Sequence, residues 1–464
     1  MLPEPALTFT IPSVHDGLPL DCRIYHPASL RTSSPAPPWQ RRAAVLAHPY
    51  APLGGSFDDP VVDIVGSRML KEGFLLGTFN FRGAGHSAGK TSWTSKAERS
   101  DFQSVIAFLA YYIYHLNPFK KSAVAHAVQH GDEPPKTPDD ALHGEPFDIP
   151  ARVRSMLVVG GYSYGSLITA NLPPLETILE PFAAPSSASN EAQIRLRAAS
   201  LAEQQNTLIR LTREALLEMT AKRSPSKHGV RVGGDEGLRR SRDGGGAGRR
   251  SRSVSRELEE KLHELVAKTK SSLAAQRHHR HASSETTTSA TLEKVPEENG
   301  GEPLAAERRQ RTAREPAAPA AQGRLPRLAG FETPRQAYVL LSPIPGLASH
   351  LVTLRVLPGA LSRPRRPEED PAEAKLVRHP TVAVHGDADL FVLPYKAREW
   401  VARLAGAPGS LFRGVEVPGA GHFWAEEGVL EQLLDLVGEF IRGLVTDDQG
   451  DDWQARQHED VTDD

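Results

Sequence analysis

The sequence predicts an α/β fold with a mostly parallel sheet and helices on both faces of that sheet. Three observations predict it. Short apolar runs rich in β-branched residues alternate along the chain with helical segments. Several of these runs are continuously apolar, as expected for parallel strands that are buried on both faces. Glycine-rich loops follow three of them directly, so the loops should meet at the carboxyl edge of the sheet, where active sites lie in such folds.

The expected elements follow in chain order. Two strands, 7–11 and 20–25, should pair antiparallel around a turn at Asp16-Gly17. The other expected strands, each a short apolar run, are 43–47, 74–79, 156–160, 336–341, 381–384 and 412–417. The expected helices, which have helical composition or an apolar stripe, are 61–72, 100–116, 166–172, 395–404 and 429–445.

The core is expected in two parts of the chain, 1–183 and 334–446, with low-complexity sequence between and after them. Residues 117–150 should be an insertion loop, and residues 447–464 an acidic tail. The long segment 184–333 should be a largely disordered insertion, because its polar tracts bury too little apolar surface to offset chain entropy. Three of its stretches have a composition of their own: charged helices could form at 190–222 and 257–275, and an Arg/Ser/Gly run spans 239–256. We favour a solvated linker for that run, although it could bind RNA or acidic partners or accept phosphate, and a protein partner could bind through residues 184–333.

Composition excludes several classes of protein. The net charge of −2 gives no global field for nucleic acid or membranes, so no nucleic-acid partner is expected. The single cysteine, Cys22, excludes an intrachain disulfide framework. Residues 1–30 lack the pattern of a signal peptide, and no apolar run is long enough to span a membrane. These features predict a cytoplasmic location.

The stretch Met156–Leu172 is the centre of the functional prediction. An apolar strand leads into the pentapeptide GYSYG, and a helix follows that pentapeptide directly. This is the pattern of a nucleophile elbow, in which Ser163 lies at the apex of a strained turn. Gly161 and Gly165 would allow strand and helix to approach closely. The N–H group of Tyr164 would then face the site as an oxyanion donor.

Two further residues fit the serine in order and position. A serine needs a base to take its proton, and the base needs a carboxylate to hold its tautomer. Asp389 follows one expected strand and His422 follows the next, which is the order Ser, Asp, His of this kind of site. Asp387 is an alternative for the acid.

Five segments resemble one family when they are taken together. They are HPYAPLGGSFDDPVV from His48, FNFRGAGHSAG from Phe79, GYSYG from Gly161, VHGDADLFVLP from Val384 and PGAGHFW from Pro418. In this order they resemble the α/β-hydrolases, and most of all a small group of predicted serine hydrolases known mainly from bacteria.

The resemblance implies roles for particular residues. It makes Asp389 the acid and His422 the base, and it places the second oxyanion donor in the loop after the first parallel strand. Because Pro49 has no N–H group, that donor must be Tyr50 or Ala51, and Tyr50 matches the usual position. His48 is expected to hold the loop in place rather than to react.

The sequence therefore predicts a serine hydrolase. It should cleave an ester, thioester or amide of a small-molecule or acyl substrate through an acyl-enzyme on Ser163. No metal or nucleotide cofactor is implied, because the sequence offers no Cys/His ligand cluster and the glycine-rich loop lacks the lysine of a P-loop. The alternative is a non-catalytic scaffold of the same fold that binds partners through residues 184–333.

Overall fold

The computed structural model describes residues 1–30, 39–92, 94–118, 154–223, 323–344 and 370–446. Its centre is an eight-stranded sheet with the order β1-β2-β4-β3-β5-β6-β7-β8. The strands are β1 (Leu7–Pro12), β2 (Pro19–Tyr25), β3 (Arg42–Ala47), β4 (Leu75–Phe79), β5 (Met156–Tyr162), β6 (Arg335–Leu341), β7 (Thr381–Gly386) and β8 (Phe412–Val417). Strands β3 to β8 are parallel, whereas β2 is antiparallel to both β1 and β4. The predicted mostly parallel sheet is confirmed.

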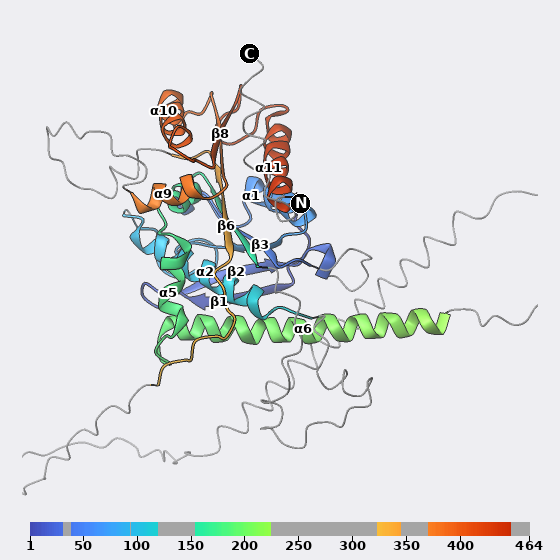
Figure 1. Ribbon diagram of the computed structural model, residues 1–464. Helices are drawn as coiled ribbons and strands as arrows, with labels where there is room; N and C mark the ends of the chain where they lie inside the picture. Colours follow the sequence, from blue (N-terminus) through green and yellow to red (C-terminus); the bar gives the residue numbers. More distant parts are fainter. Residues whose placement is uncertain (31–38, 93, 119–153, 224–322, 345–369, 447–464) are drawn as a thin grey trace, which may run out of the picture. The chain divides into compact units, whose positions relative to one another are not determined.

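Helices cover both faces of this sheet (Figure 1). One face is covered by α1 (Pro60–Lys71) and α11 (Val429–Thr446). The other face is covered by α2 (Lys96–His115), α4 (Tyr164–Ala170), α5 (Leu175–Ala183), α6 (Asn190–Arg223), α9 (Pro371–Arg378) and α10 (Pro394–Ala405). Two short 3-10 helices, η1 (Ala28–Leu30) and η2 (Ala51–Leu53), lie in loops.

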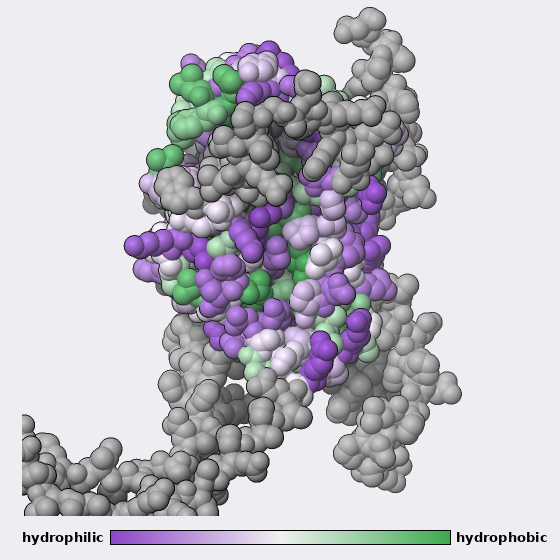
Figure 2. Space-filling view, turned by 90° about the vertical axis from the view of Figure 1, so that its left-hand side faces the viewer, coloured by the Kyte–Doolittle hydropathy of each residue, from purple (hydrophilic) through white to green (hydrophobic). Residues whose placement is uncertain are grey.

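Strand β5 shows why the central strands are continuously apolar. Leu157 and Val159 belong to the hydrophobic core on the α2 side, whereas Val158 between them belongs to the core on the α1 side. Successive side chains of a strand point to opposite faces, so a strand between two helical layers needs apolar residues at every position. Figure 2 shows the outer surface on the side of α9 and α10, where hydrophilic residues surround smaller apolar patches.

Helix α9 lies in a stretch where no helix was expected from the sequence. Asp370 caps its first turn, since the carboxylate accepts a hydrogen bond from the Ala372 N–H at 2.9 Å. Pro371 occupies the first helical position, where its missing N–H costs nothing. The helix has only eight residues, and three of them are charged, so its apolar positions are too few to mark a helix in the sequence.

Helix α6 corrects the predicted start of the second insertion. Residues 190–223 form this helix, and Ile194, Ala198 and Leu201 belong to the hydrophobic core on the α2 side. The Arg195 guanidinium donates to the Ala183 carbonyl at 2.8 Å. The segment is therefore not disordered up to residue 223, and the charged helix that the sequence allowed at 190–222 is present as α6. The charged outer residues of α6 dominate its composition and hide the apolar positions.

Several predicted segments lie outside the described residues. These are most of the 117–150 loop, the stretch 224–322 of the second insertion with its Arg/Ser/Gly run, and the acidic tail 447–464. Within the described part of the chain, no helix combines the length and the apolar character that a membrane crossing requires.

Candidate active site

Ser163 lies at the junction of β5 and α4, as the elbow pattern predicts. Its backbone has φ 55° and ψ −113°, a strained conformation for a residue with a side chain. A Cβ atom on Gly161 would lie 2.3 Å from the Gly165 carbonyl carbon, and one on Gly165 would lie 2.3 Å from the Ala47 carbonyl oxygen. Only glycine fits at these two positions, because the strand, the helix and the neighbouring β3 approach so closely.

Three side chains are hydrogen-bonded in series at the carboxyl edge of the sheet. His422 Nε2 lies 2.7 Å from Ser163 Oγ, and His422 Nδ1 lies 2.7 Å from Asp389 Oδ2. All three residues are buried, with exposed fractions of 8% for the serine, 6% for the histidine and 5% for the aspartate. Because a carboxylate only accepts, His422 carries its proton on Nδ1 in the neutral state, and Nε2 is free to accept the serine proton.

The two aspartates that the sequence left as alternatives make different contacts. Asp389 Oδ2 meets His422, and its Oδ1 accepts from the N–H groups of Phe391 at 2.7 Å and Val392 at 3.0 Å. Asp387 Oδ1 instead accepts from the Gly419 N–H at 2.7 Å. Asp387 thus ties the loop after β7 to the loop after β8, while Asp389 contacts the histidine.

Both expected oxyanion residues border the same cavity as Ser163. Tyr164 is the first residue of α4, so its N–H has no acceptor within the helix. Tyr50 precedes η2, and its carbonyl accepts from the N–H groups of Leu53 and Gly55, which fixes the loop in a tight turn. The rings of Tyr50 and Tyr164 are in edge contact, with centroids 5.1 Å apart.

His48 holds the loop that carries Tyr50. The Phe81 N–H donates to His48 Nε2 at 2.9 Å, so the ring proton is on Nδ1 and is donated to the Pro49 carbonyl at 2.6 Å. Burial lowers the pKa of His48 to about 4, so the ring is neutral at physiological pH. The histidine thereby joins the loop after β3 to the loop after β4.

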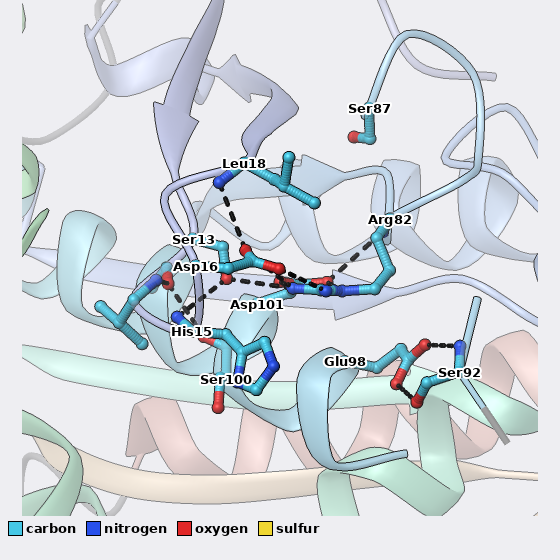
Figure 3. Close-up of polar contacts among 12 residues, drawn as sticks. Ser13, His15, Asp16, Leu18, Arg82, Ser87, Ser92, Glu98, Ser100 and Asp101 are labelled. Carbon is cyan, nitrogen blue, oxygen red and sulfur yellow. Dashed lines mark hydrogen bonds and ion pairs between the residues drawn. The ribbon is translucent and has the colours of Figure 1, made fainter. Parts of the chain in front are cut away.

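Arg82 of the glycine-rich loop is an anchor that the sequence analysis did not identify. Its guanidinium donates to Asp101 Oδ1 at 2.6 Å and to Asp16 Oδ2 at 2.9 Å (Figure 3). The hydrogen bond to buried Asp101 raises the pKa of Arg82 well above its usual value. This loop continues to Ser92, which borders the cavity and donates to Glu98 at 2.6 Å. Arg82 therefore secures one wall of the site.

A cavity of about 370 Å³ opens over Ser163. Most of its wall is apolar or aromatic, and three of the wall residues, Leu53, Phe391 and Phe423, are more than half exposed. Asp59 and His422 are the titratable side chains, apart from tyrosines, among the described residues that line it. None of the three apolar residues was predicted from the sequence, although each lies within one of the five segments that carry the family resemblance.

Comparisons with known proteins give likeness in structure only. No family model matches the sequence, and no curated protein matches it significantly. One similar solved structure is XC6422 from Xanthomonas campestris, described as an α/β serine hydrolase without lid, at 13% identity and a TM-score of 0.37, covering 96% of this chain and 97% of that chain. An α/β serine hydrolase homologue from Coxiella burnetii has 11% identity and a TM-score of 0.35, with 95% and 99% covered. Est1E from Butyrivibrio proteoclasticus has 10% identity and a TM-score of 0.33, with 95% and 99% covered.

The sheet order, the antiparallel β2 and the elbow after β5 are features of this chain itself. With helices on both faces, they make up the architecture that the sequence resemblance implied. The protein therefore has the α/β-hydrolase fold, with Ser163, His422 and Asp389 hydrogen-bonded in series at the carboxyl edge of its sheet.

Proposed function

We propose that the protein is a serine hydrolase that cleaves a carboxylic ester through an acyl-enzyme on Ser163. Thioesters and amides undergo the same acyl-transfer step. The observation that carries the proposal is the series of hydrogen bonds from Ser163 through His422 to Asp389, each 2.7 Å long, beneath an open cavity. A serine, a base and an orienting carboxylate in this order constitute the machinery of acyl transfer.

In the first step, Ser163 Oγ attacks the substrate carbonyl carbon while its proton passes to His422 Nε2. The N–H groups of Tyr50 and Tyr164 stabilise the oxyanion of the tetrahedral intermediate. Asp389 stabilises the imidazolium through Nδ1–H and stays ionised. His422 then protonates the leaving alkoxide, and the C–O bond breaks to leave the acyl group on Ser163.

In the second step, His422 takes a proton from water, and the resulting hydroxide attacks the acyl carbonyl. Collapse of the second tetrahedral intermediate returns the proton to Ser163 and releases the carboxylic acid. The apolar wall formed by Leu53, Phe391 and Phe423 favours an apolar group on the substrate. Asp59 in the same wall disfavours substrates that carry a carboxylate close to the ester.

A fluorophosphonate probe tests the nucleophile, and hydrolysis of p-nitrophenyl butyrate tests turnover. We expect the wild-type protein to be labelled and to hydrolyse the ester. Ser163→Ala should abolish labelling and lower kcat by at least about 10⁴-fold. Ser166→Ala is the matched control, because Ser166 is fully buried only three residues further along α4 and should be dispensable for both.

A folded wild-type protein that is neither labelled nor active would refute the proposal and favour the non-catalytic scaffold. Labelling that persists in Ser163→Ala would mean that another residue is the nucleophile.

A further inference from the structure

The backbone carbonyl of His422 is held from the strands beneath it. The Tyr162 hydroxyl donates to this carbonyl oxygen at 2.9 Å, and the Ser342 hydroxyl makes a longer contact of 3.5 Å with the same atom. All three residues are buried. Since a carbonyl can only accept, both hydroxyls must act as donors here.

The contact from Ser342 is itself fixed by its neighbours. The Trp424 indole N–H donates to Ser342 Oγ at 3.0 Å, and the Ser342 N–H donates to the Val384 carbonyl at 2.8 Å. Ser342 and Trp424 both adopt left-handed backbone conformations, with φ 45° and 56°. Such conformations cost energy in residues with side chains, so packing and hydrogen bonds must hold this arrangement in place.

Tyr162 immediately precedes Ser163 at the end of β5. Two consecutive residues therefore contact opposite parts of one histidine: Tyr162 holds the main chain of His422, and Ser163 meets its ring. The tyrosine can act as a lasting donor, since burial raises its pKa well above the usual value and keeps the hydroxyl protonated.

We infer that Tyr162 is a positioning residue that sets the distance between the His422 ring and Ser163 Oγ, with Ser342 as a weaker second support. The inference rests on the proposed function, in which His422 must transfer protons to and from atoms at hydrogen-bond distance. A small displacement of a catalytic group can slow a reaction far more than it weakens substrate binding. Tyr162 also borders the cavity, but its hydroxyl is engaged by the His422 carbonyl, so we assign it a positioning role and not a role on the substrate's reacting atoms.

The test is Tyr162→Phe in the full chain, with Tyr338→Phe as its matched control. Tyr338 is also a buried tyrosine of a central strand, and its hydroxyl donates to Gln336 Oε1 at 2.8 Å, a contact within its own strand β6. For hydrolysis of p-nitrophenyl butyrate, Tyr162→Phe should lower kcat between about tenfold and a hundredfold and leave KM within about twofold. Tyr338→Phe should leave both kcat and KM within about twofold of the wild type, even if its melting temperature falls as much as that of Tyr162→Phe.

Ser342→Ala is a second variant that removes the longer contact. It should lower kcat less than Tyr162→Phe does, because the 2.9 Å bond from Tyr162 remains. An equal loss of kcat in Tyr162→Phe and Tyr338→Phe would overturn the inference, since the loss would then follow from a general disturbance of the core.

A second measurement needs no catalysis and so separates this inference from the proposed function. The proton between His422 Nδ1 and Asp389 can be observed by NMR in the protein alone. Its resonance should broaden or shift in Tyr162→Phe and stay unchanged in Tyr338→Phe. If the wild type is inactive but this resonance responds as expected, the proposed function fails and the positioning role stands. An unchanged resonance in Tyr162→Phe would refute the positioning role.

Discussion

At the scale of single residues, the loop after β7 carries two carboxylates of different use. Asp389 contacts the His422 ring and is held by two backbone N–H groups, so its orientation is fixed. Asp387 receives one backbone N–H from Gly419. Only one residue, Ala388, separates the two carboxylates in the chain, yet it is Asp389 that contacts the histidine.

We expect Asp389→Asn to lower kcat on p-nitrophenyl butyrate by about 10³- to 10⁴-fold, because an amide cannot stabilise the imidazolium and favours the wrong tautomer. The matched variant Asp387→Asn keeps an oxygen that can accept from Gly419, and it should lower kcat by less than about fivefold. Steady-state kinetics at neutral pH measure both. A larger loss of kcat in Asp387→Asn than in Asp389→Asn would show that Asp387 is the acid.

At the scale of elements, the site depends on loops that follow different strands and are tied to one another. His48 joins the loop after β3 to the loop after β4, and Asp387 joins the loop after β7 to the loop after β8. Arg82 secures the glycine-rich loop after β4 to Asp101 on α2. The geometry of the site is thus set by contacts between loops as well as by the sheet.

The neutral state of His48 predicts an acid-sensitive fold. Its pKa is lowered from 6.5 in the unfolded chain to about 4 in the native protein, so between these values only the unfolded chain takes up the proton. This pKa difference contributes about 3 kcal/mol to the free energy of unfolding. The contribution is fully present above pH 6.5 and is lost as the pH falls toward 4.

Urea unfolding of the wild type and of His48→Gln across pH 4 to 7.5 measures this effect. Glutamine has no proton to gain, so the difference in free energy of unfolding between the two proteins should shrink by about 3 kcal/mol as the pH is lowered. Parallel curves for the two proteins would show that His48 does not cause the acid sensitivity.

At the scale of the whole molecule, α6 belongs with the hydrolase fold. Ile194, Ala198 and Leu201 fill part of the core, and Arg195 donates to carbonyls at the end of α5. The sheet, the three hydrogen-bonded side chains and the cavity all lie within residues 1–221 and 324–446. Helix α6 therefore contributes to the same core as the sheet and the site.

Replacement of residues 224–322 by a flexible Gly/Ser linker should leave a protein that unfolds cooperatively and still reacts with a fluorophosphonate. From Arg195 to Arg223 the helix rises roughly 42 Å. Arg195 donates to the Pro326 carbonyl, so the chain resumes after the replaced stretch close to Arg195. The linker must therefore reach from Arg223 back over a similar distance, and a Gly/Ser linker of roughly 60 residues has this end-to-end distance on average. The matched variant, in which residues 190–322 are replaced, should be strongly destabilised, because it removes Ile194, Ala198 and Leu201 from the core.

Thermal unfolding and probe labelling distinguish the two replacements. A shorter chain without α6 that is as stable as the wild type would show that the helix contributes little to the core. Loss of cooperative unfolding after replacement of 224–322 alone would show that the fold depends on that stretch.

The sequence by itself determined the fold class, the strand order along the chain and the elbow. Short apolar runs rich in β-branched residues predict central strands buried on both faces, and GYSYG between a strand and a helix has a local geometry that glycine dictates. Such features depend on residues adjacent in the chain, and their physical causes are visible in a short stretch. The order of Ser163, Asp389 and His422 along the chain is also read from the sequence, because Asp389 and His422 each follow an expected strand.

Only the tertiary structure decided between contacts that join distant residues. Asp387 and Asp389 have the same chemistry, and the course of the loop after β7 decides which carboxylate reaches His422. The contact from Tyr162 to the His422 carbonyl joins residues 260 positions apart. Helix α6 looks like a solvated segment by composition, because charged and polar residues are spread along its whole length, and its core positions have meaning only beside α2 and α5. Burial depends on what lies opposite a residue in space, and the fold alone sets that.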